Sequence, residues 1–199
     1  MSYLYFLFCR SFFKYYCPLK VEGQENLPAG PFILCSNHNS HIDSPVLMLA
    51  TGIAFNQFGM VAAKDYFFDN PWRNKIVNSL MNLIPIDRKV SRLSLANNIS
   101  ACKQFVENGQ RNLILYPEGT RSITGETQSF KRGPAMMALK LAMPLIPVYI
   151  EGSYQVLRKG QYFPRRGKIN VKIGKPIIAC KDKKQVTELL ENSIKKLKE

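Results

Sequence analysis

Short apolar runs alternate with longer stretches of helical pattern along most of this chain, and this alternation constrains the fold more than any other feature. The runs are typical of buried strands, and the stretches between them carry apolar residues at helical spacing. Strands are expected at 32–36, 58–63, 83–86, 112–116, 145–150 and 169–173, and helices at 44–52, 71–81, 92–108, 134–141 and 183–197. This order predicts an α/β fold, a single domain with a largely parallel central sheet flanked by helices. The proline at 147 predicts that its strand lies at an edge of the sheet or contains a bulge.

The composition indicates one folded domain. The chain has 199 residues, of which 46% are apolar, and this suffices for a sizeable core. The cysteines, at 9, 17, 35, 102 and 180, are odd in number and scattered, which indicates reduced thiols in a cytosolic compartment. We expect the domain to cover residues 21–199, preceded by a separate segment, 1–20.

That N-terminal segment combines aromatic rings with basic side chains. Residues 3–8 are all aromatic or leucine, and Arg10, Lys14 and Lys20 follow. The segment is too short and too often charged to span a bilayer, whereas rings and basic groups together favour a membrane interface. We therefore expect an amphipathic helix on the cytoplasmic face of a membrane, bound peripherally or monotopically. The alternative is a helix packed on the domain's own core.

The chain is strongly basic. Its 28 Lys and Arg residues against 14 Asp and Glu residues give a formal net charge of +14. Such an excess indicates an anionic partner, which could be nucleic acid, an anionic membrane surface or a phosphorylated small molecule. Because no helix-turn-helix, RNP-like or zinc-finger pattern is present, we expect no nucleic-acid partner.

Polar residues gather directly after four of the expected strands, at 37–43, 87–88, 117–122 and 151–153. Ligands of open α/β sheets bind beyond the carboxyl ends of the strands. We therefore expect these clusters to share one crevice.

The first cluster contains both histidines of the chain, and its spacing suits a base. On a helix His38 and Asp43 would point away from each other, so they can meet only across a turn. Pro45 is tolerated in a first helical turn, which predicts a helix that begins near Ser44 with Asp43 as its N-cap. In this arrangement the carboxylate can hold one imidazole nitrogen while the other faces the crevice, as in a general-base histidine.

Two other interpretations of this cluster stay open. Asp43 could serve only as a helix cap, since Ser40 and Asp43 have the spacing of a capping box. His38, His41 and Asp43 could instead bind a metal ion, but the chain has no third histidine and no C-x-x-C pair, so we expect no metal site. His41 alone is interpreted as a structural residue.

The segment after strand 112–116 suits an anionic group. Gly119 permits a tight turn, Thr120 supplies a hydroxyl, and Arg121 offers a planar fork that matches phosphate or carboxylate. Lys131 adds positive charge just before the helix at 134–141. Taken in isolation, the segment could equally be a hydrophilic turn.

Together these segments resemble the lysophospholipid and glycerol-phosphate acyltransferase family, whose first motif is a histidine and an aspartate separated by four residues. The spacing of His38 and Asp43 alone is a weak signal, whereas four matches in the family's order are a strong one. The matches are N-H-N-S-H-I-D at 37–43, I-P-I-D-R at 84–88, Y-P-E-G-T-R-S at 116–122 and I-P-V-Y-I-E-G at 146–152. One departure is Pro85, which stands where a less constrained residue is expected.

The resemblance implies a reaction. A fatty acyl group would move from a thioester, on coenzyme A or acyl carrier protein, to the free sn-2 hydroxyl of 1-acylglycerol 3-phosphate, giving phosphatidic acid in phospholipid biosynthesis. No cofactor is implied, because the thioester is a co-substrate. A neutral imidazole, with an ordinary pKa of about 6.5, can take the hydroxyl proton near pH 7. A covalent intermediate is not required, and no G-x-S-x-G motif is present.

The resemblance also implies residue roles, with His38 as general base and Asp43 as the residue that orients it. The acceptor phosphate would be bound by Glu118, Gly119 and Arg121 with Arg88 beside them, and Thr120 and Lys131 are further candidates.

Other functions stay open. The same motifs would serve acylation of glycerol 3-phosphate or of another lysophospholipid. From a different class, the chain could be a non-catalytic, basic peripheral protein that binds membranes. The intact set of His38, Asp43, Glu118 and Arg121 argues against that alternative.

Overall fold

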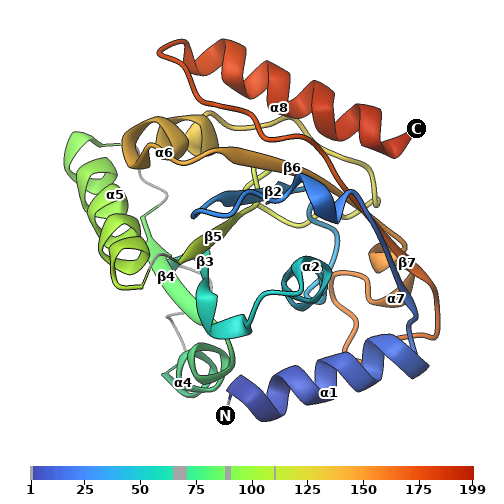
Figure 1. The fold of residues 1–199 in the computed structure, drawn as a ribbon. Helices are drawn as coiled ribbons and strands as arrows, with labels where there is room; N and C mark the ends of the chain where they lie inside the picture. Colours follow the sequence, from blue (N-terminus) through green and yellow to red (C-terminus); the bar gives the residue numbers. More distant parts are fainter. Residues whose placement is uncertain (1, 65–70, 88–90, 110) are drawn as a thin grey trace.

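The computed structural model describes residues 2–64, 71–87, 91–109 and 111–199, in which a seven-stranded sheet lies between two layers of helices (Figure 1). The strand order is β1-β7-β6-β2-β5-β3-β4, and each described pairing is parallel except that of β6 with β7. The strands are β1 (Leu19–Glu22), β2 (Ile33–Ser36), β3 (Phe58–Ala63), β4 (Asn82–Ile86), β5 (Asn112–Leu115), β6 (Leu145–Glu151) and β7 (Ile169–Ile173). The predicted α/β fold with a largely parallel sheet is confirmed.

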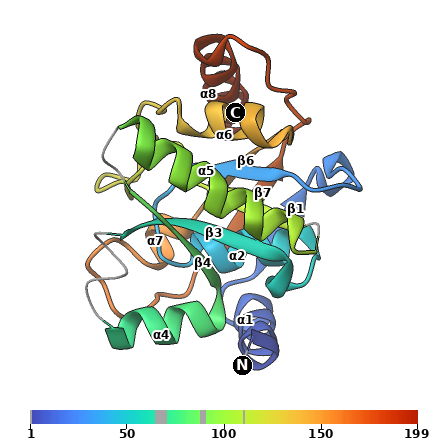
Figure 2. The same ribbon diagram turned by 90° about the vertical axis from the view of Figure 1, so that its left-hand side faces the viewer.

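Helices cover both faces of this sheet. In Figure 1, α1, α2 and α4 lie below the strands, and α6 and α8 lie above them; Figure 2 shows α8 and α6 above and α1 and α4 below from the side. The helices are α1 (Ser2–Tyr15), α2 (Asp43–Thr51), α4 (Pro71–Leu80), α5 (Arg92–Glu107), α6 (Gly133–Leu141), α7 (Ser153–Val156) and α8 (Lys183–Lys198), with short 3-10 turns η1 (Gln24–Asn26) and η2 (Phe55–Gln57). Each helix predicted from the sequence is present.

The two helical layers explain why the central strands read as unbroken apolar runs. Leu34 and Ile114 pack into one core cluster with α1 and α2, whereas Ile33 and Leu113 pack into another with α5, α6 and α8. All four residues of β2 are buried. A strand covered on both faces has no polar side, which is why its position could be predicted from apolar residues alone.

β1 is a strand that the sequence analysis did not predict. Its four residues, L-K-V-E, alternate between half-buried and exposed, and it pairs on one side with β7 at the edge of the sheet. Leu19 and Lys20, which we assigned to the N-terminal segment, therefore belong to the sheet.

α1 has one face on the core and another on the surface. Cys9 and Phe13 are buried in the cluster that includes α2, and the rings of Phe6 and Phe55 meet edge to face at 5.4 Å. Large apolar side chains on its outer side are exposed: Tyr3, Leu4, Phe8 and Tyr15. Among the helices of the described ranges, none combines the length and the apolar character that crossing a bilayer requires.

Pro147 corrects the prediction of an edge strand, because β6 lies inside the sheet between β7 and β2. Its carbonyl oxygen accepts a hydrogen bond of 2.8 Å from the N–H of Gly174, just outside the last antiparallel pair, Val148 with Ile173. The proline nitrogen faces the same side as its carbonyl, and beyond it the pairing resumes out of register, because Leu145 and Ile177 exchange hydrogen bonds of 2.9 and 2.8 Å. Between these pairs two residues, 175 and 176, lie opposite Ile146 alone, so the proline stands beside a bulge, which was the second predicted alternative.

Candidate active site

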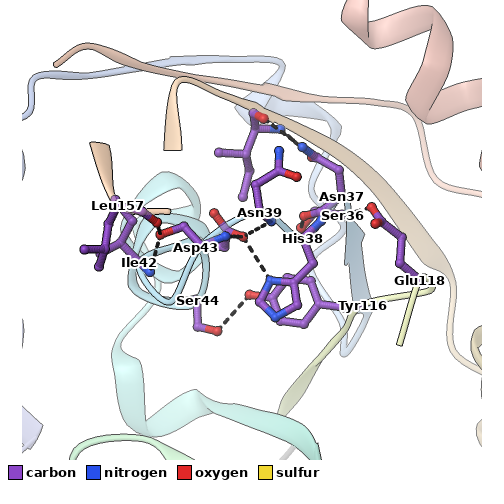
Figure 3. Close-up of polar contacts among 12 residues, drawn as sticks. Ser36, Asn37, His38, Asn39, Ile42, Asp43, Ser44, Tyr116, Glu118 and Leu157 are labelled. Carbon is purple, nitrogen blue, oxygen red and sulfur yellow. Dashed lines mark hydrogen bonds and ion pairs between the residues drawn. The ribbon is translucent and has the colours of Figure 1, made fainter. Parts of the chain in front are cut away.

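The side chains of His38 and Asp43 meet directly after β2, as predicted (Figure 3). His38 Nδ1 donates to Asp43 Oδ2 over 2.9 Å. The same oxygen accepts the backbone N–H groups of Asn39, at 2.7 Å, and Ser40, at 2.8 Å. Asp43 is fully buried, whereas the His38 side chain keeps 17% exposure. With Nδ1 bound in this way, the second imidazole nitrogen, Nε2, is the one left for chemistry.

The predicted role of Asp43 as a helix N-cap is wrong. α2 begins at Asp43 itself, and Ile42, in the capping position, makes no side-chain hydrogen bond to the helix. The Asp43 carboxylate instead turns back to the preceding loop. Half of the predicted capping box forms there, because Asp43 accepts the N–H of Ser40, while Ser40 Oγ accepts the N–H of Ile42 at 3.3 Å. One carboxylate thus closes the turn and holds the imidazole.

Tyr116 fixes the plane of the imidazole, although the sequence analysis did not assign it a role. Its ring stacks on that of His38 with centroids 3.6 Å apart and an interplanar angle of 11°. The hydroxyl shares a hydrogen bond of 2.7 Å with Ser44 Oγ at the start of α2. Burial, and then the negative charge of Asp43, raise the pKa of Tyr116 well above its ordinary value, so the hydroxyl keeps its proton. The sequence feature that could have indicated this role is the position of Tyr116, directly before the P-E-G-T-R-S segment.

Asn37 anchors the start of the same loop and was also missed. Its Nδ2 donates to the carbonyl oxygen of Ile150, and its Oδ1 accepts the N–H of Ile150, both over 2.8 Å. This pair of bonds ties the end of β2 to the end of β6. The base of the loop at 37–43 is therefore part of the sheet.

The segment at 117–122 is bonded to the backbone of His38. Glu118 Oε1 accepts the N–H of His38 at 3.1 Å, and the carbonyl oxygen of His38 accepts the N–H of Ser122 at 2.7 Å. Glu118 is only 2% exposed. Burial raises its pKa to about 7, and the N–H groups of His38 and Gln128 offset part of that rise. The first and third polar clusters thus meet, as expected.

The basic candidates lie along this segment. Gly119 has a φ of 73°, and a Cβ built there would meet Lys131 Nζ at 2.8 Å, so the lysine side chain passes over the glycine. Arg121 is 9% exposed and directly precedes Ser122, whose N–H is bonded to His38. Thr120 is exposed. Lys131 and Arg121 therefore belong to the loops around the histidine.

The described residues Asp87 and Glu151 of the other two polar clusters make contacts of their own. Arg88 lies outside the described residues, and its neighbour Asp87 pairs with Lys64 Nζ at 3.1 Å. Glu151 is exposed and accepts from Asn170 Nδ2 at 2.8 Å. Within the described ranges, no three His, Cys, Asp or Glu side chains gather in the manner of a metal site.

Comparison with known proteins identifies the family. The model of the family described as Acyltransferase matches residues 18–151. The chain is 30% identical over 169 residues to the chloroplastic 1-acyl-sn-glycerol-3-phosphate acyltransferase LPAT1 of Arabidopsis thaliana, covering 82% of this chain and 44% of that protein. It is also 30% identical over 161 residues to the 1-acyl-sn-glycerol-3-phosphate acyltransferase of Saccharomyces cerevisiae, covering 80% of this chain and 51% of that protein. The chain spans about half the length of these curated relatives.

A solved structure has a similar fold. The crystal structure of the 1-acyl-sn-glycerophosphate (LPA) acyltransferase PlsC of Thermotoga maritima matches with a TM-score of 0.73 and 29% sequence identity, over 99% of this chain and 79% of that one. The matched range of the family model contains His38 and Asp43, and it extends through the segment at 117–122. By sequence and by fold, this chain belongs to the acyltransferase family.

Proposed function

We propose that this chain transfers a fatty acyl group from an acyl thioester to the free sn-2 hydroxyl of a 1-acylglycerol 3-phosphate, giving phosphatidic acid. The observation that carries the proposal is the contact of 2.9 Å between His38 Nδ1 and Asp43 Oδ2, beside the segment at 117–122, which contains Arg121 and is bonded to the backbone of the same histidine. The names of the Arabidopsis and yeast relatives support the choice of acceptor.

The proposed chemistry uses His38 as a general base. As the acceptor oxygen attacks the thioester carbonyl carbon, its proton moves to His38 Nε2. The carbon–sulfur bond then breaks, and the imidazolium returns the proton to the departing thiolate, so that no group stays on the protein. Asp43 holds the ring by Nδ1 and offsets the positive charge that forms on it. This chemistry needs no cofactor besides the thioester, which can be acyl-CoA or acyl-acyl carrier protein.

We assign the binding of the acceptor phosphate to Arg121, in the segment at 117–122, and to Lys131. Arg121 offers a bidentate fork in the segment that Gly119 turns, and Lys131, whose side chain passes over Gly119, offers a point charge. Thr120, Glu118 and Arg88 are further candidates for contacts with the glycerol phosphate. A phosphate beside the imidazole would bring the acceptor hydroxyl to Nε2, and positioning of this kind is a large part of catalysis.

We further propose that the protein works at the cytoplasmic face of a membrane, to which the exposed side of α1 binds peripherally or monotopically. Tyr3, Leu4 and Phe8 are apolar groups of the interfacial type, and a net charge of +14 favours an anionic leaflet. An acceptor with an acyl chain resides in such a surface.

One panel of assays tests the function. The purified chain is offered lysophosphatidate, glycerol 3-phosphate and lysophosphatidylethanolamine, each with oleoyl-CoA and with oleoyl-acyl carrier protein, and the products are identified by mass. We expect phosphatidate from lysophosphatidate and no product from His38→Ala. Preferential acylation of either other acceptor would move the assignment to that acceptor. Vesicle binding without acyl transfer to any acceptor would favour a non-catalytic membrane-binding protein.

A further inference from the structure

The connection between α7 and β7 displays two adjacent aromatic side chains. Tyr162 is 91% exposed and Phe163 is 85% exposed, the highest values among the large apolar side chains of the described residues. Neither ring belongs to a core cluster of the described chain. Adjacent rings held in water indicate a surface that meets another phase or molecule.

The same connection lies in a stretch without acidic residues. From 152 to 181 the sequence contains no aspartate or glutamate. The basic residues of this stretch are Arg158, Lys159, Arg165, Arg166, Lys168, Lys172, Lys175 and Lys181. Four of them flank the two rings closely, so aromatic and cationic groups are interleaved, as in segments that bind anionic membrane surfaces.

The loop at 158–166 is closed at its base by backbone hydrogen bonds. The N–H of Arg165 donates to the carbonyl oxygen of Val156 at 2.7 Å, and the N–H of Gln161 donates to that of Arg158 at 3.1 Å. The rings are therefore displayed by a shaped loop, and little ordering is needed when they bind.

This loop adjoins the C-terminal end of α1. Tyr16 Oη donates to the carbonyl oxygen of Pro164 at 3.2 Å, and Cys17 Sγ donates to that of Arg165 at 3.5 Å. In Figure 1 the orange connection after α7 runs beside that end of the helix. The exposed aromatic side of α1 and the rings of the loop therefore belong to neighbouring elements.

We propose that residues 158–166 are a second membrane-contact element, in which Tyr162 and Phe163 enter the headgroup region of an anionic leaflet beside α1. The inference rests on the membrane location proposed above. A lipid surface is favoured over a protein partner because basic residues flank the rings on both sides and the stretch 152–181 contains no carboxylate.

Contact with the bilayer through both α1 and the loop at 158–166 would fix the orientation of the protein, which contact through α1 alone leaves free. Ser40 Oγ donates to the carbonyl oxygen of Leu157 at 2.7 Å, which joins the base of this loop to the turn between His38 and Asp43. A helix lying on a surface can still roll about its axis. Contact through the loop as well would stop that roll and hold the His38 loop at a constant angle to the bilayer.

Vesicle sedimentation tests the aromatic part. The chain is titrated with vesicles of phosphatidylcholine containing phosphatidylglycerol, and the double variant Tyr162→Ser/Phe163→Ser is compared with Ile178→Ser/Leu189→Ser. The control pair also removes exposed apolar side chains, but at α8 and just before it. We expect the loop variant to bind roughly tenfold more weakly or worse, because the apolar area of two rings stays in water. The control should bind as the wild type does, and equal binding by the loop variant would overturn the proposal.

A second pair of variants tests whether the charge acts locally. Arg165→Gln/Arg166→Gln and Lys140→Gln/Lys196→Gln each remove two positive charges from exposed positions. At a contact surface each basic residue contributes roughly a fivefold gain in affinity for an anionic leaflet. The first double variant should therefore weaken vesicle binding much more than the second. Equal losses of affinity would overturn a local role of Arg165 and Arg166 and leave only long-range attraction between the basic chain and the vesicle.

Insertion can be observed without measuring acyl transfer. In a Trp72→Phe background, Phe163→Trp should show blue-shifted emission that brominated lipids quench, whereas Leu189→Trp should show neither change. Unquenched emission from Phe163→Trp on bound vesicles would overturn the proposal, even if the serine variants fail to fold. An inactive protein that passes this test would refute only the enzymatic function, and an active one that fails it would refute only the loop contact.

Discussion

The imidazole of His38 and the phenol ring of Tyr116 lie face to face, 3.6 Å apart and within 11° of parallel. Asp43 restrains the imidazole through Nδ1, within the plane of the ring, whereas Tyr116 restrains the tilt of that plane. Ser44 holds the tyrosine hydroxyl in turn. The direction of Nε2 is therefore set by Tyr116, directly after β5, together with groups at the start of α2.

The role of Tyr116 can be tested by graded substitution. Tyr116→Phe keeps the stacked ring and loses only the bond to Ser44, so we expect a several-fold fall in kcat. Tyr116→Ala frees the imidazole and should lower kcat roughly a hundredfold, because loss of alignment is costly in catalysis. Steady-state kinetics with lysophosphatidate would measure both. Equal kcat in the alanine variant and the wild type would show that the stack does not position the base.

Asp43→Asn should lower kcat by roughly 10² to 10⁴ while the protein stays folded, because the amide no longer offsets the charge on His38. The control is the same substitution in a His38→Ala background. If Asp43 acts through the histidine, Asp43→Asn should cost nothing further there. A further large loss in the double variant would give Asp43 a role independent of the base.

Arg121→Ala should mainly raise KM for lysophosphatidate. Loss of a charge-assisted contact predicts a rise of roughly tenfold to a hundredfold, with a smaller change in kcat. Arg132→Ala, at an exposed position nearby, is the matched control. A monoacylglycerol, which lacks the phosphate, should be used equally poorly by wild type and Arg121→Ala. Equal KM values for lysophosphatidate would remove Arg121 from the phosphate site.

Glu118 predicts a pH dependence of stability. Its pKa is about 7 in the folded chain against an ordinary 4.5, so between these values the folded state holds a proton that the unfolded state has released. The stability linked to this group is complete below pH 4.5 and is lost as pH rises to 7. The linked loss is on the order of 1 to 3 kcal/mol.

Glu118→Gln removes that titration. Chemical denaturation at pH 5, 6 and 7 should give a falling free energy of unfolding in the wild type and a flatter profile in the variant. Parallel profiles would show that Glu118 does not titrate in this range. Glu151→Gln, at an exposed carboxylate near the end of β6, is the control for loss of a negative charge.

The sequence predicted the elements that are buried on both faces. β2 and β5 are covered by helices above and below, so each is an apolar run with one polar residue at an end, Ser36 or Asn112, and this pattern is typical of a buried strand. β1 was missed because its alternation of half-buried and exposed residues over only four positions is indistinguishable from a loop. Of the two alternatives predicted for Pro147, the edge strand was wrong because the sequence does not reveal strand order, whereas a bulge is present in the chain that follows β7.

The sequence predicted the two central residues of the candidate site, His38 and Asp43, but not the contacts that hold them in place. A turn between His38 and Asp43 follows from their spacing. The direction of the carboxylate does not, because a residue at the start of a helix can bond forward to the helix or back to the loop. The stacking of Tyr116 and the amide bonds of Asn37 depend on β5 and β6 lying on either side of β2, which is a property of strand order.

The amide of Asn37 reproduces, with a side chain, the two hydrogen bonds that one more step of β-ladder would have supplied to Ile150. The loop with the histidine therefore starts from the centre of the sheet. Opening the base of that loop would require breaking both of these bonds beside the central strands, so we expect the backbone N–H of Ile150 to exchange with solvent only in openings that also separate β2 from β6.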